Sequence, residues 1–224
     1  MPAPTTEAKG FRLTLTNNLE LIIAILLGLV SIATAYASFQ GSLYGGLSDD
    51  SNNLAIAQST EAESLYLEGN QQFMQDTQIF NDLSVLQVAI NAGDAVAQEQ
   101  YDQLYFQGVS EDFGAAIDRA AAQTEADPDF FYSPLDDEEY QNVLFTPYAD
   151  KSDEAAATKV KADAQGAQGD LLTLYTVLMA IALFLFGVAA LVKESRTRFV
   201  LIGTGTVLSA VAIVLTLTIP FVGI

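Results

Sequence analysis

The chain contains no cysteine, no histidine and no tryptophan among its 224 residues. Without cysteine there is no disulfide, no thiol nucleophile and no thiolate metal ligand. Without histidine the chain lacks the commonest general base, the commonest metal ligand and the usual protonation switch near neutral pH. No phosphate-binding loop, dinucleotide-binding glycine motif or zinc-binding HExxH motif takes their place. We therefore expect a protein that is not an enzyme and that uses no cofactor.

Basic residues are also scarce, with 9 Lys and Arg against 28 Asp and Glu, giving a net charge of −19. Nucleic acid is excluded as a partner, because binding to phosphates needs clustered Lys and Arg. Yet half of the residues are hydrophobic. An acidic chain can be this apolar when its apolar and acidic residues lie in different segments, and here they do.

Three apolar runs are long and free of charge: residues 21–37, 171–192 and 199–222. A bilayer core of ~30 Å requires a helix of roughly 20 apolar residues, and the first run reaches that length if its helix continues to residue 43. The sequence therefore predicts an all-α membrane protein with three transmembrane helices and an extracytoplasmic α-helical bundle between the first and second. The predicted segments are 1–20 (cytoplasmic), 21–43 (first span), 44–170 (acidic outer domain), 171–192 (second span), 193–198 (cytoplasmic loop) and 199–222 (third span).

The basic residues predict the orientation of the chain. Lys9 and Arg12 precede the first span, and Lys193, Arg196 and Arg198 lie between the second and third. Cytoplasmic flanks of membrane spans are enriched in such residues. We therefore expect a multi-pass protein of a prokaryotic plasma membrane, with residues 44–170 outside. All but three of the acids lie in residues 39–170, in agreement with this topology.

The first span carries small residues at alternating steps of four and three. Close packing between membrane helices depends on such residues, since lipid provides no hydrophobic drive between them. This small-residue seam predicts a contact face, either within the chain or against an identical neighbour. It consists of Ala24, Gly28, Ser31, Ala35, Ser38, Ser42 and Gly45. The second and third spans carry similar rows: Thr173, Thr176, Ala180, Gly187 and Ala190 in one, and Gly205, Ser209, Ala212 and Thr216 in the other.

Ala35-Tyr36-Ala37 also resembles a signal-peptide cleavage site. We favour an uncleaved anchor, because the apolar helical pattern does not stop there. Gly45-Gly46 is expected to break or bend the chain before the next helix.

The sequence of the outer segment, residues 44–170, predicts helices and one loop. A proline-free apolar stripe over 47–124 is typical of helices, with a stop at 91–94, a second helix over 95–107 capped by Asp94 and a third capped by Ser110. Three prolines and paired aromatic residues in 125–150 favour an extended, ordered loop. Residues 151–170 are predicted to be helical and to run into the second span.

Two groups of acids are candidate sites. Asp127, Asp129, Asp136 and Asp137 are oxygen ligands of the kind calcium prefers, although an EF-hand pattern is missing and a solvated acidic loop is the favoured interpretation. Asp76 interrupts the apolar stripe, and a buried carboxylate needs a partner. Arg119 is the only base between residues 13 and 150. An Asp76–Arg119 pair is therefore one hypothesis, and a hydrated Asp76 at the edge of the stripe is the other.

The stretches "ATAYASFQGSLYGG" and "MQDTQIFNDL", followed by a proline-containing acidic segment and two closing spans, resemble a group of uncharacterised bacterial membrane proteins. The group has one span, a helical extracytoplasmic region and two C-terminal spans, and it implies no activity. This chain departs from it with Tyr36 and Tyr44 where tryptophan is expected.

The sequence thus favours a non-enzymatic protein in the lipid bilayer that self-associates or serves as an accessory or structural subunit of a larger membrane assembly. The alternative is an oligomeric sensor or channel-like protein whose acidic outer domain binds a cation or small ligand. A membrane enzyme is a third and weaker hypothesis.

Overall fold

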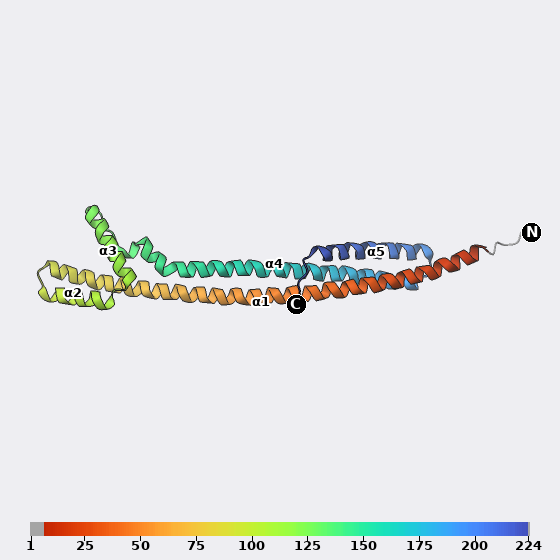
Figure 1. Cartoon of the computed structure of the whole chain (residues 1–224). Coiled ribbons are helices and arrows are strands. Elements are labelled where there is room, and N and C mark those ends of the chain that lie inside the picture. Colours follow the sequence, from red (N-terminus) through yellow and green to blue (C-terminus); the bar gives the residue numbers. More distant parts are fainter. Residues whose placement is uncertain (1–6, 224) are drawn as a thin grey trace, which may run out of the picture. The chain divides into compact units, whose positions relative to one another are not determined.

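The computed structural model describes residues 7–223, with side chains from residue 19 onward (Figure 1). Residues 1–6 and 224 lie outside the described residues, as do the side chains of Lys9 and Arg12 on which the predicted orientation depends. The elements are α1 (Glu7–Asn91), α2 (Ala95–Gly108), α3 (Glu111–Ala126), the short 3₁₀ helix η1 (Pro134–Asp136), α4 (Glu138–Leu191) and α5 (Ser195–Thr218). The described chain has no strand, so the all-α prediction is confirmed.

Three of these helices, α1, α4 and α5, are long and apolar enough to cross a membrane, consistent with a multi-pass membrane protein. Two of them far exceed the roughly 20 residues that a span requires, since α1 has 85 residues and α4 has 54. The prediction that the first and second apolar runs continue as helices into the segment between them is therefore confirmed. The predicted break at Gly45-Gly46 is wrong, because α1 runs through both glycines and neither has a positive φ.

The end of α1 agrees with the sequence signals. After Asn91 the chain turns at Gly93, whose φ of 90° suits a residue without a side chain. Asp94 then caps α2, its carboxylate accepting hydrogen bonds from the N–H groups of Val96 and Ala97. Ser110 caps α3 in the same way through the N–H of Phe113. Both predicted caps are confirmed.

The prediction of a loop over residues 125–150 is wrong in its second half. The chain is irregular from 127 to 133, but α4 begins at Glu138 and includes Pro147. Asp137 starts this helix, since its Oδ1 accepts a hydrogen bond from the Tyr140 N–H at 2.8 Å. Glu138 and Glu139 in the first turn then interact favourably with the positive end of the helix dipole. Pro147 lies inside this helix, at the cost of one backbone hydrogen bond.

The chain divides into two compact units. Unit 1 contains the residues up to Asn52 and those from Val160 onward, and unit 2 contains Asn53–Lys159. In unit 1, α1 packs against α4 through buried residues spaced seven apart: Ile23, Val30, Ala37 and Tyr44. The backbones approach closely at Gly41, where an added Cβ would lie 3.4 Å from the Leu172 Cβ. This close approach uses small residues as helix packing in lipid requires.

The third helix of unit 1, α5, packs beside α4 (Figure 1). Its predicted contact row of Gly205, Ser209, Ala212 and Thr216 is buried, so that prediction is confirmed. An added Cβ at Gly205 would lie 2.8 Å from the ring of Phe186. After α5, the segment 219–223 is held to α1, because the Gln40 amide both donates to the Val222 carbonyl, at 3.1 Å, and accepts from its N–H, at 3.0 Å.

Unit 2 has an aromatic core built on Phe113, Ala116 and Tyr140. Its long helices are joined by polar contacts. Lys151 of α4 pairs with Glu61 of α1 at 3.2 Å and with Glu154 at 2.9 Å. The helices come closest at Gly69, where an added Cβ would lie 2.6 Å from the Leu144 carbonyl oxygen.

Candidate functional site

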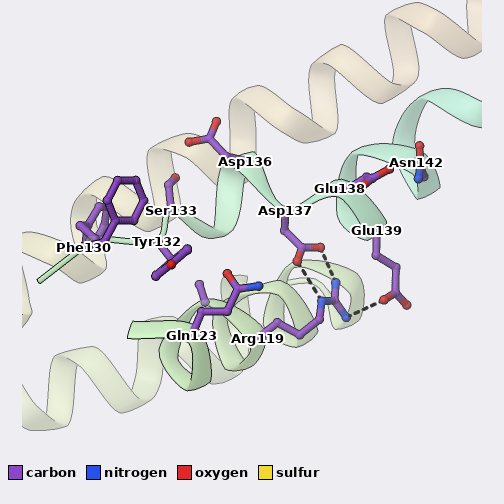
Figure 2. A pocket seen from close by; sticks show the side chains of 12 residues that line it. Arg119, Gln123, Phe130, Tyr132, Ser133, Asp136, Asp137, Glu138, Glu139 and Asn142 are labelled. Carbon is purple, nitrogen blue, oxygen red and sulfur yellow. Dashed lines mark hydrogen bonds and ion pairs between the residues drawn. The ribbon is translucent and has the colours of Figure 1, made fainter. Parts of the chain in front are cut away.

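The main candidate site is a pocket of about 670 Å³ in unit 2 (Figure 2). Three segments form it: one face of α3, the irregular chain before η1 and the first turn of α4. The Asp94 and Ser110 caps position α2 and α3, and the proline-containing chain then returns to start α4. The lining residues are Arg119, Ala120, Gln123, Phe130, Phe131, Tyr132, Ser133, Asp136, Asp137, Glu138, Glu139 and Asn142.

Arg119 anchors one wall of this pocket. Its Nε and Nη2 donate to the two carboxylate oxygens of Asp137, at 3.0 Å and 2.6 Å, a two-pronged pair (Figure 2). Its Nη1 lies 3.4 Å from a carboxylate oxygen of Glu139. The hydrogen bond from Arg119 lowers the pKa of Asp137, although partial burial opposes this, and the Tyr140 N–H adds to the lowering. The same bond raises the pKa of Arg119, so the pair remains charged at neutral pH.

The rest of the pocket is acidic and aromatic. Asp136 and Glu138 make no ion pair among the described side chains, so the single guanidinium is outnumbered by carboxylates. Phe130 and Phe131 are 59% and 70% exposed. Phe130 meets Tyr132 edge to face, with ring centroids 4.8 Å apart. Exposed rings beside uncompensated carboxylates suit an organic cation, because such ions bind both the negative charge and the faces of aromatic rings.

The structure does not support the predicted calcium site. Among the described residues, no group of three or more acids is placed to hold a metal ion. Asp136 and Asp137 line the pocket, but Asp137 is occupied by Arg119 and the Tyr140 N–H. Asp127 accepts a long hydrogen bond from the Tyr132 hydroxyl at 3.5 Å, and Asp129 is not part of the lining. The four acids therefore do not form one binding site.

The predicted Asp76–Arg119 pair is wrong, because each of the two residues has another partner. Asp76 is 0% exposed, so the hydrated alternative is also wrong. Its Oδ2 accepts from the Tyr140 hydroxyl at 2.7 Å and from the Gln72 amide at 3.0 Å. Arg119 lies with Asp137 instead. The correct partner was missed because Tyr140 follows a run of acids in a segment predicted as loop.

Tyr140 belongs to the core that supports the pocket. It is 1% exposed, and the centroid of its ring lies 5.2 Å from that of Phe113. Its backbone N–H donates a hydrogen bond to Asp137, which holds that carboxylate in place. Burial raises the pKa of its hydroxyl, and the bond to Asp76 raises it further. Tyr140 therefore stays protonated at neutral pH and donates its hydroxyl hydrogen to Asp76.

The small-residue seam of the first span does not form the contact face within the chain. Ala24, Gly28, Ser31, Ala35, Ser38 and Ser42 are exposed, and Gly45 is half-buried. The buried face of α1 instead carries Ile23, Val30, Ala37 and Tyr44. In the second span, Thr176 and Gly187 are half-buried, whereas Thr173, Ala180 and Ala190 are exposed. The seam on α1 is thus available to something outside this chain.

No protein family, curated protein or solved structure matches the chain.

Proposed function

We propose that this protein is a non-enzymatic integral membrane protein that self-associates through the small-residue seam of α1. One observation supports this most strongly: the seam lies on the exposed side of α1, although its members are smaller than the residues around it. Leu29 and Ile32, for example, are 58% and 71% exposed and stand beside seam residues. A narrow strip of Gly, Ala and Ser between larger side chains is a groove into which a second helix fits.

The physical case is specific to a membrane. Lipid tails are as apolar as leucine, so helices associate there through close backbone approach and van der Waals contact. The chain already uses this device internally, at Gly41 against Leu172 and at Gly205 against Phe186. An exposed row of the same kind supports the same use between two copies. In this proposal residues 21–43, 171–192 and 199–222 lie in a prokaryotic plasma membrane, with residues 44–170 outside.

Native mass spectrometry of the full chain in mild detergent tests the proposal. Replacing Gly28 and Ala35 together by leucine fills the strip, and nothing lies within 4 Å of a Cβ added at Gly28, so the chain itself has room. We expect the oligomer fraction to fall at least tenfold. Ala210→Leu is the matched control, because Ala210 is exposed on α5 and outside the seam.

A wild-type protein that is monomeric at every concentration would overturn self-association. Equal oligomer fractions in the wild type and the double variant would show that another surface is used. Loss in the Ala210→Leu control would show a general effect of added bulk.

The pocket in unit 2 supports a second candidate function, the binding of a small organic cation. Its exposed aromatic rings and its excess of carboxylates carry this proposal. Titration calorimetry of the full chain with tetramethylammonium and with spermidine is the test. We expect Phe131→Ala to weaken binding about tenfold, and Phe106→Ala, whose ring is 89% exposed outside the pocket, to leave it unchanged. Absence of binding for both ligands overturns this function.

A further inference from the structure

Arg198 in the first turn of α5 is a buried cation that has no partner among the described side chains. Its side chain belongs to a residue that is only 8% exposed, and its Nε and Nη2 are buried without a hydrogen bond. No carboxylate among the described side chains forms an ion pair with it. A guanidinium does not lose its proton in proteins, so the charge itself must be compensated.

The chain leaves further donors unsatisfied at the same place. Glu194 occupies the N-cap position of α5 but makes no side-chain capping bond, because its carboxylate accepts from the Thr197 hydroxyl at 3.0 Å. The N–H groups that open a helix have no acceptor within it, and the helix dipole makes this end positive. Lys193 and Arg196 lie exposed in the same short link. Three bases against one acid leave this end of α5 positively charged.

An oxyanion meets both requirements. Phosphate oxygens accept from a guanidinium in a two-pronged geometry and from the N–H groups of a helix start. In the proposed topology the site also lies at the start of the third span, where the phosphate groups of lipids are found. We propose that Arg198 and the first turn of α5 bind a phosphate group, supplied by an anionic lipid headgroup or by free phosphate. This site is independent of self-association, since it lies within one chain.

The test uses the full chain in mild detergent, with bound lipid counted by native mass spectrometry and stability followed by thermal melting. The probes are phosphatidylglycerol, zwitterionic phosphatidylcholine and inorganic phosphate. We expect phosphatidylglycerol to be retained and to raise the melting temperature, and Arg198→Gln to lower this retention at least tenfold. Arg196→Gln is the control, since Arg196 is an exposed base in the same link.

The outcomes separate the two sources. Protection by phosphatidylglycerol alone assigns a lipid headgroup, and protection by inorganic phosphate alone assigns a free anion, each lost in Arg198→Gln. Equal retention of lipid in Arg198→Gln and the wild type overturns the site, as does an equal loss of retention in Arg196→Gln.

Without added phosphate, Arg198→Gln should melt no lower than the wild type, because it removes an uncompensated charge. A lower melting temperature would assign the guanidinium to the chain's own structure and overturn the site. Arg198→Lys keeps the positive charge but lacks the paired N–H groups of a guanidinium. Undiminished retention of phosphatidylglycerol in this variant would contradict the two-pronged contact.

Discussion

The two units are built from the same long helices but are held together differently. In unit 1 the helices approach closely at small residues, since Ala37, Ala182, Ala189 and Ala212 are 0% exposed. Hydroxyl groups such as that of Thr216 donate to a carbonyl of their own helix. Unit 2, with 21 acids against three bases, packs aromatic rings in its core and joins its helices through ion pairs such as that of Lys151 with Glu61. The lesson is that one helical architecture has two kinds of core. Close approach dominates where apolar spans meet, whereas large rings and paired charges dominate in the acidic unit.

The largest effect expected from this comparison is the loss of ring volume in unit 2. Phe113 is 0% exposed and contacts the rings of Phe80 and Tyr140. Phe113→Ala should reduce the free energy of unfolding of this unit by about 3–5 kcal/mol, because it leaves a cavity. Hydrogen exchange over α3 and the start of α4 in the full chain measures this. Phe106→Ala, at a ring 89% exposed, should leave exchange unchanged. Equal protection in the two variants would contradict an aromatic core.

The second prediction concerns the buried polar bond of unit 2. Tyr140→Phe keeps the ring but removes the hydroxyl, so the buried Asp76 loses the shorter of its two hydrogen bonds. A buried acceptor left without its partner costs about 1–3 kcal/mol. Urea unfolding followed by circular dichroism should show this loss. Tyr132→Phe is the control, since its hydroxyl bond is long and exposed. A loss no greater than that of Tyr132→Phe would mean that the bond contributes nothing.

The third prediction concerns close packing in unit 1. Gly205→Ala places a Cβ 2.8 Å from the ring of Phe186, which is 0% exposed and has no room to move. Overpacking of this kind costs about 1–3 kcal/mol, partly offset by the better helix propensity of alanine. Thermal melting in detergent should show a lower melting temperature. Gly46→Ala, with nothing within 4 Å of the added Cβ, should raise it slightly. The reverse order would contradict packing by shape.

The smallest predicted effect is electrostatic. The hydrogen bond from Arg119 lowers the pKa of Asp137 in the folded protein, so the pair stabilises unit 2 above the ordinary carboxyl pKa of about 4 and ceases to do so as the pH falls through the folded pKa. The wild type should therefore be more stable than Arg119→Gln at pH 7, and the difference should shrink as the pH falls below about 4. Melting both proteins across this range measures it. A pH-independent difference would mean that Arg119 acts by packing alone.

Much of this fold follows from local signals in the sequence. The charge-free runs predict the three apolar helices, and Gly93, Asp94 and Ser110 mark helix boundaries by their own chemistry. The errors have a common cause, which is that tertiary contacts override local preference. Gly45-Gly46 remains helical within the long packed α1, and Pro147 lies within α4 where this helix packs closely on α1 at Gly69 and Leu144.

The candidate pocket was only partly predictable. The acids and paired aromatics of residues 125–150 identify the segment, but not the Arg119–Asp137 pair that organises it. Several acids lie within reach of Arg119 along the chain, and only the return of the chain into α4 selects Asp137. The seam on α1 can be read from the sequence as a row of small residues, but its exposed position follows from the packing of α4 on the opposite face of α1.

The absence of cysteine allows the central proposal, self-association through the seam of α1, to be tested directly by disulfide formation between single introduced cysteines in native membranes. One set replaces Gly28, Ala35 or Ser42, each exposed on the seam, and the matched set replaces Val30, Ala37 or Tyr44, each at most 5% exposed on the opposing face. A disulfide forms only when two Cα atoms approach within about 4.4–6.8 Å. Covalent dimers from seam positions, and none from the buried positions, are the predicted result. Monomers at every seam position, or equal crosslinking from both sets, would contradict it.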